Sequence, residues 1–145
     1  MHWLLTMMAV LIGFGYSLYV ASILKGNADL TENGMMASLS AWLEQNGEKS
    51  KRKIWMAYWG SMLFEAAYLY LAYTSLGNWA FQVLTSGVLG IEVYVWVRVF
   101  QRLRGFFRGR VLMAELLPWK AERISALALF THAVVVLLFP ITTWF

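Results

Sequence analysis

Residues 54–100 read IWMAYWGSMLFEAAYLYLAYTSLGNWAFQVLTSGVLGIEVYVWVRVF. Two apolar runs, 54–76 and 79–100, stand on either side of a short turn that contains Gly77 and Asn78. Each run has about the 20 residues with which an α-helix crosses a ~30 Å hydrocarbon layer. A turn this short permits only an antiparallel helical hairpin. The two helices are therefore expected to be neighbours in a membrane.

Outside this hairpin, two further apolar runs of similar length occupy residues 3–24 and 124–144. Of the 145 residues, 60% are hydrophobic and 14% are charged, whereas roughly a quarter are charged in an ordinary soluble domain. The sequence therefore predicts an all-α, polytopic membrane protein with four transmembrane helices. The whole chain, residues 1–145, is expected to form a single membrane domain.

The basic residues indicate how the chain is oriented. Every Lys and Arg falls in one of two segments, 25–53 and 98–123. The positive-inside rule places both segments on the cytoplasmic side, so both termini are expected to be extracytoplasmic, and we expect a bacterial inner membrane. Tryptophans would then approach both boundaries: Trp3, Trp79 and Trp144 the outer one, and Trp55, Trp96 and Trp119 the inner one.

A short amphipathic helix is predicted in the first cytoplasmic loop, over residues 34–47. Its apolar residues recur at spacings of three and four, and Gly47 is suited to end it. Such a helix is expected to lie in the headgroup region. It is either an interfacial anchor or a docking site or gate for a partner, and the sequence does not separate these roles.

Anionic lipid headgroups are the expected partners of the basic loops. The residues assigned to this contact are Lys51, Arg52, Lys53, Arg102, Arg104, Arg108 and Arg110. Basic residues interleaved with aromatic ones, as around Phe106 and Phe107, can also bind single-stranded nucleic acid. Because these residues flank apolar runs of membrane length, the lipid bilayer is favoured and nucleic acid is disfavoured.

Small residues recur every four positions in the first span, at Ala9, Gly13, Ser17 and Ala21. In a membrane, such a stripe allows another helix backbone to approach closely. The partner is either a helix of the same chain or one of a second copy. We accordingly expect a homo-oligomer or an assembly with other membrane subunits.

Polar residues inside the predicted spans give the main functional clue. Glu65, Glu92 and His132 each lie within a different span, and each costs a few kcal/mol in hydrocarbon. Counted at 1.5 Å per residue from the inner ends, Glu65 lies roughly 16 Å deep, and Glu92, His132 and Tyr16 lie roughly 12 Å deep. The four side chains are therefore predicted to converge in one buried polar site.

Three uses of such a site remain open. Burial favours the neutral form of a carboxyl group, and a neighbouring imidazole exchanges protons near neutrality, so the site suits a proton relay. Glu65, Glu92 and His132 are alternatively suited to a divalent cation, and no other cofactor is predicted. The third use is structural, with the polar groups bonding helix to helix.

An enzymatic site has the least support. Cys is absent, and the two His residues, His2 and His132, cannot form the metal-hydrolase motif H-E-x-x-H. The serine-hydrolase motif G-x-S-x-G is also missing from the sequence. The predicted function is a small membrane component that handles protons or cations, within an oligomer or a larger complex. The alternative is a non-catalytic accessory or assembly subunit of a multi-subunit membrane complex.

Overall fold

The computed structural model describes residues 2–75, 77–110 and 116–144, and the side chains of residues 3–138 within these ranges. This part of the chain forms five α-helices and no strand, which confirms the all-α prediction. The helices are α1 His2–Leu24, α2 Ala28–Asn46, α3 Lys49–Ser75, α4 Trp79–Phe107 and α5 Trp119–Trp144. The side chain of Trp144, assigned above to the outer boundary, lies outside the described residues.

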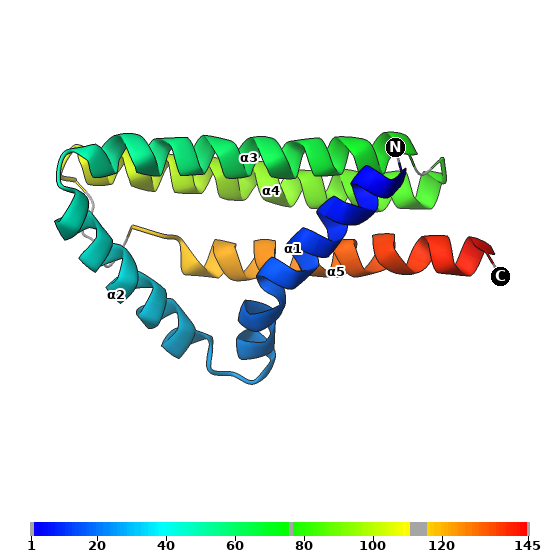
Figure 1. Cartoon of the computed structure of the whole chain (residues 1–145), viewed down its shortest axis with the longest axis horizontal. Helices are drawn as coiled ribbons and strands as arrows, with labels where there is room; N and C mark the ends of the chain where they lie inside the picture. Colours follow the sequence, from blue (N-terminus) through cyan, green and yellow to red (C-terminus); the bar gives the residue numbers. More distant parts are fainter. Residues whose placement is uncertain (1, 76, 111–115, 145) are drawn as a thin grey trace.

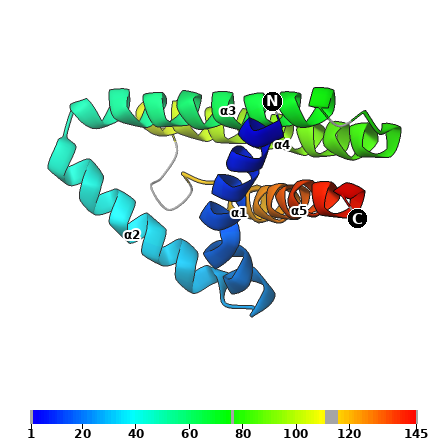
Figure 2. The ribbon, with the colours of Figure 1, turned by 45° about the vertical axis from the view of Figure 1, so that its right-hand side comes forward.

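Helices α3 and α4 form the predicted antiparallel hairpin and lie side by side along their length (Figures 1 and 2). The side chain of Asn78 accepts a hydrogen bond of 3.0 Å from the backbone N–H of Ala80, which begins α4. Both helices extend beyond the expected runs, because the flanking basic residues also adopt helix. We call the end where α3 begins and α4 ends the basic end, and the end with the α3–α4 connection the turn end.

Helix α5 runs antiparallel to α4, and α1 crosses α5 obliquely instead of running along the bundle (Figures 1 and 2). The N-terminal end of α1 and the C-terminal end of α5 both lie toward the turn end (Figure 1). The main core forms where the helices meet and contains Leu5, Met8, Ala9, Ile12, Tyr68, Leu69, Ala72, Phe81, Val88, Leu129, Ala133 and Val136. This packing holds four helices around one interior.

Helix α2 connects the far end of α1 to the basic end of α3 (Figure 1). It begins at Ala28, six residues before the start expected at 34, and it ends as predicted at Gly47. Gly47 has a φ of +53°, which favours glycine, and its N–H donates to the Leu43 carbonyl at 3.0 Å. The placement of α2 in a headgroup region stays a prediction.

Three of the described helices are long and apolar enough to cross a membrane, over Trp3–Leu24, Trp79–Phe107 and Trp119–Leu138. One helix fewer than the predicted four meets this criterion, because α3 does not. Its apolar residues are interrupted by Glu65 and by Tyr and Trp side chains, which lower the mean hydropathy. The three apolar helices are consistent with a multi-pass membrane protein.

The outer faces of these helices are apolar as well. Phe14 and Leu18 on α1 are 82% and 83% exposed. On α4, the large apolar side chains that point outward include Val83, Leu84, Leu89, Val93 and Val97. Exposed apolar surface of this extent is unusual for a soluble monomer and fits contact with lipid.

Only one of the four positions of the small-residue stripe of α1 is buried within this chain. Ala9 is fully buried in the core, whereas Ser17 and Ala21 are partly exposed. A Cβ added at Gly13 would meet nothing within 4 Å. A close backbone approach at Gly13 within the chain is therefore excluded, and the use of the stripe by a second copy stays a prediction.

Candidate cation site

Buried polar residues of α4 and α5 lie on the faces by which the two helices pack. Buried positions alternate at spacings of three and four, which places them on one side of each helix. They include Phe81, Thr85, Val88, Glu92 and Val95 on α4, and Ser125, Leu129, His132 and Val136 on α5. Because the helices are antiparallel, the polar residues of one face meet those of the other.

Glu92 is the one carboxylic acid of this set, and 1% of its surface is exposed. Its Oε1 accepts a hydrogen bond of 2.8 Å from the Ser125 hydroxyl of α5. Glu65 of α3 lines the same cavity as Glu92 of α4 and Ser125 of α5. Two of the predicted site residues are thus brought together between α3, α4 and α5.

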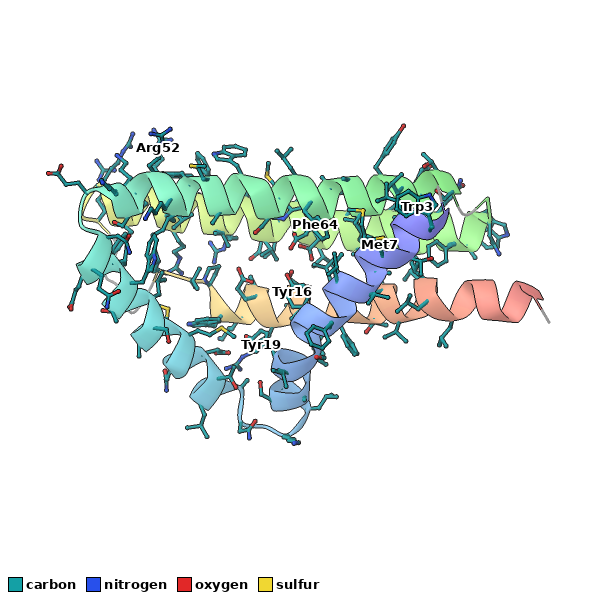
Figure 3. All side chains as sticks on the ribbon, viewed as in Figure 1. Trp3, Met7, Tyr16, Tyr19, Arg52 and Phe64 are labelled. Carbon is teal, nitrogen blue, oxygen red and sulfur yellow. The ribbon has the colours of Figure 1, made fainter. Side chains whose placement is uncertain are left out.

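Glu65 is held by two donors from other helices. The Tyr16 hydroxyl of α1 donates to Oε1 at 3.1 Å, and the Trp96 indole N–H of α4 donates to Oε2 at 2.9 Å. Figure 3 shows Tyr16 where α1 crosses the bundle and Trp3 at the N-terminal end of α1. Trp96 therefore serves the buried site, in addition to its expected place near the inner boundary.

A cavity of about 300 Å³ lies beside these carboxyl groups. Its polar and aromatic lining includes Tyr16, Tyr58, Glu65, Glu92, Trp96, Glu122 and Ser125, and α2 contributes Leu39. Among the described residues that line the cavity, none is Lys or Arg. Carboxylate oxygens and aromatic faces without a balancing cation favour a positively charged occupant.

His132 belongs to a second polar cluster and is not among the described residues that line the cavity. Its Nδ1 lies 2.7 Å from the Tyr68 hydroxyl, and its Nε2 lies 2.9 Å from the Thr85 hydroxyl. His132 lies two helical turns beyond Ser125 on the same face of α5. At 1.5 Å per residue, this separation along the helix axis is ~10 Å. The predicted site of two glutamates and one histidine is therefore divided into two clusters.

The division also bears on metal binding. Within the described part of the chain, no group of three or more His, Asp or Glu side chains is arranged to hold a metal ion. The divalent cation site predicted at Glu65, Glu92 and His132 is thus not assembled by this fold. An ion at the cavity would meet carboxyl and hydroxyl groups, without the imidazole.

A third polar cluster joins α2 to the start of α5. Arg123 donates to Glu32 through Nε at 2.9 Å and through Nη2 at 2.8 Å, and to Asp29 at 2.6 Å. The Tyr19 hydroxyl of α1 donates to Oε2 of Glu32 at 2.9 Å. This Arg123 cluster fixes α1, α2 and α5 to one another next to Glu122, which lines the cavity.

Several residues of these clusters were not identified from the sequence. Glu122 and Arg123 were placed in a loop, because the last helix was expected to begin at 124 and begins at Trp119. A usable signal was present, since Glu122, Ser125 and His132 fall on one helical face at spacings of three and seven. Glu32 was likewise placed before the loop helix that now contains it.

Comparisons with protein-family models, with curated proteins and with solved structures give no match. The functional argument therefore depends on the geometry of the described residues. That geometry offers a cavity with three carboxylic acids, a buried histidine cluster with both ring nitrogens engaged, and an ion-paired connection between α2 and α5.

Proposed function

We propose that this chain is a multi-pass membrane protein that crosses the bilayer four times and admits protons or other small cations to the cavity beside Glu65 and Glu92. The observation that carries the proposal is that these two carboxyl groups line one cavity. Glu122 adds a third carboxyl group to the same lining. Because ionisable groups are costly inside a membrane, their convergence on a cavity favours a functional role.

The fourth crossing follows from the position of α3 next to α4. An antiparallel helix that lies along a membrane-spanning neighbour passes through the same layer. Glu65, the main obstacle to insertion of α3, has both carboxyl oxygens hydrogen-bonded, by Tyr16 and Trp96. Internal partners of this kind reduce the cost of a polar group in hydrocarbon. The basic end is then cytoplasmic and both termini are extracytoplasmic, which suits a bacterial inner membrane.

Electrostatics explains why a cation would enter. Two adjacent carboxylates repel each other strongly where water is scarce, since the Coulomb energy rises as the effective dielectric constant falls. A proton shared between Glu65 and Glu92, or a cation beside them, relieves this repulsion. The hydroxyl groups of Tyr16 and Ser125, which donate to the two carboxyl groups, are placed to adjust to either state.

Flux through proteoliposomes tests the proposal. The purified protein is reconstituted with a trapped pH-sensitive dye, and proton entry is followed after a potassium diffusion potential is applied. Glu65→Gln and Glu92→Gln should each reduce the initial rate at least ~10-fold. The matched control is Glu44→Gln, because Glu44 is exposed on α2 and outside the cavity.

Interpreting the flux requires a check that each variant is folded and parallel assays with other ions. Each variant must elute as the wild type does from a sizing column. If flux of protons, and of sodium or potassium in parallel assays, equals that of the Glu44→Gln control, the transport proposal is wrong.

A second candidate, an accessory or assembly subunit, is favoured by the histidine cluster. Both ring nitrogens of His132 are hydrogen-bonded, to Tyr68 and Thr85, an arrangement that joins three helices. In this case Glu65→Gln should be mild and Glu65→Leu should weaken the bundle. Light scattering after size-exclusion chromatography would show whether the protein forms a homo-oligomer or requires other subunits.

A further inference from the structure

A second hollow lies on the outer surface at the basic end, between α3 and α4. It has a volume of about 360 Å³, and we call it the basic groove. Its lining consists of Lys51, Trp55 and Trp59 from α3, and Phe100, Arg104, Phe107 and Arg108 from α4 and its C-terminal cap. The groove shares no lining residue with the cavity beside Glu65 and Glu92.

Aromatic rings form the floor of the basic groove. The ring centroids of Trp55 and Phe100 lie 5.4 Å apart, and those of Trp59 and Phe100 lie 6.4 Å apart. Phe107 lies 6.3 Å from Trp55. These edge-to-face and tilted contacts connect α3 to α4 and hold the rings in place. Trp59 nevertheless remains 45% exposed, so the floor is open to an apolar ligand.

Three cations border the same groove. The Lys51 ammonium lies 5.7 Å from the centroid of the Phe107 ring. Arg104 is in the last turn of α4, and Arg108 caps that helix. Among the described residues that line the groove, none is acidic. An adjoining hollow, which shares Lys51, Trp55 and Trp59 with the groove, is lined also by Glu48 and Arg52.

The order of these residues along the helices separates charge from apolar surface. On α3, Lys51 is followed one and two turns later by Trp55 and Trp59. On the antiparallel α4, Arg104 and Arg108 follow Phe100 in the sequence and are therefore nearer the basic end. The charges therefore gather at the helix ends, and the rings extend ~12 Å toward the middle of the bundle, at 1.5 Å per residue.

We propose that the basic groove binds one acidic phospholipid. Its phosphate is held by Lys51, Arg104 and Arg108, and an acyl chain lies along Trp55, Trp59 and Phe100. Charge complementarity supports this occupant, because the groove combines an anion-binding end with an apolar floor as a phospholipid combines a charged headgroup with hydrocarbon. The site is more specific than the general headgroup contact expected of the basic loops, and it does not depend on the cation cavity.

Native mass spectrometry in detergent tests the proposal. The probes are phosphatidylglycerol and phosphatidylcholine with identical acyl chains, supplied in equal amounts. The wild type should retain one phosphatidylglycerol at least ~10-fold more tightly than phosphatidylcholine. The double variant Arg104→Gln/Arg108→Gln should lose this preference. The control Lys25→Gln/Arg98→Gln removes the same charge outside the groove and should keep it.

Further measurements distinguish binding of a whole phospholipid from binding of its phosphate alone. Trp59→Ala should lower the affinity for both lipids, since it removes apolar floor and no charge. Glycerol 3-phosphate at the same concentration should not displace the lipid. The proposal is overturned if the two double variants behave alike, or if glycerol 3-phosphate competes as well as phosphatidylglycerol. Should the Arg104→Gln/Arg108→Gln protein misfold, Lys51→Gln alone must show at least a ~3-fold loss of preference.

Discussion

The Tyr68 hydroxyl lies 2.7 Å from Nδ1 of His132 and joins α3 to α5 inside the core. Thr85 on α4 lies 2.9 Å from the other ring nitrogen, and the tautomer of the imidazole decides which partner donates. The Tyr68 ring also packs edge-on against the imidazole, with the centroids 5.3 Å apart. One buried side chain of α5 is thereby held by partners on two other helices, α3 and α4.

Tyr68→Phe is expected to destabilise the bundle by about 1 kcal/mol. The substitution keeps the ring packing but leaves Nδ1 of His132 without its partner, and a buried unsatisfied group costs ~1–3 kcal/mol in soluble proteins. Interhelical hydrogen bonds in membranes contribute less, ~0.6 kcal/mol on average. Unfolding in mixed micelles with increasing dodecyl sulfate measures the difference.

The control for Tyr68→Phe is Tyr70→Phe on the same helix. Tyr70 is 68% exposed and should tolerate loss of its hydroxyl group with no measurable change. Equal midpoints for the wild type and the Tyr68→Phe protein would show that the histidine cluster contributes nothing to stability.

A Leu introduced at Ala9 should be damaging, whereas a Leu at Gly13 should be tolerated by a single chain. Ala9 is fully buried in the core, and overpacking a filled core costs ~1–3 kcal/mol. Space is open around Gly13. The same unfolding assay measures both variants. If Gly13→Leu instead dissociates an oligomer, the small-residue stripe contacts a second copy.

Much of the fold could be predicted from the sequence. Apolar runs gave the four long helices, the short turn gave the α3–α4 hairpin, and Gly47 marked the end of α2, because each follows from local composition and backbone preference. The oblique crossing of α1 was not predicted. It depends on which side chains pack between α1 and α5, and no periodicity within one helix reveals that.

The sequence predicted several residues of the candidate site but not which of them face one another. Counting residues from the inner ends predicted that Glu65, Glu92 and His132 lie within about one turn of a common level. Depth leaves the rotation of each helix undetermined, so it did not show that Glu92 faces Ser125 while His132 faces Tyr68 and Thr85. Thr85 and Glu92 are seven residues apart, and so are Ser125 and His132. Because α4 and α5 are antiparallel, these equal spacings allow Glu92 to face Ser125 while Thr85 faces His132.

Arg123→Gln is expected to release the N-terminal part of α2. Glu32 has 5% of its side chain exposed and would keep only Tyr19 as a partner, so its carboxylate would move toward water. Amide hydrogen exchange over residues 28–35 should become faster. Lys120→Gln, an exposed change one turn earlier in α5, should leave the exchange rates unchanged. Asp29→Asn should have the smaller effect, since that side chain is 85% exposed.

Single-cysteine labelling decides whether α3 crosses the membrane, and the natural absence of Cys makes each introduced thiol unique. Arg52→Cys at the basic end and Gly77→Cys at the turn end both replace exposed residues. In intact inverted and right-side-out vesicles, a membrane-impermeant maleimide should label Cys at these two positions from opposite sides. Arg108→Cys should share the side of Arg52→Cys, because α4 returns along α3. If Arg52→Cys and Gly77→Cys are labelled from the same side, α3 does not span the bilayer and only three crossings remain.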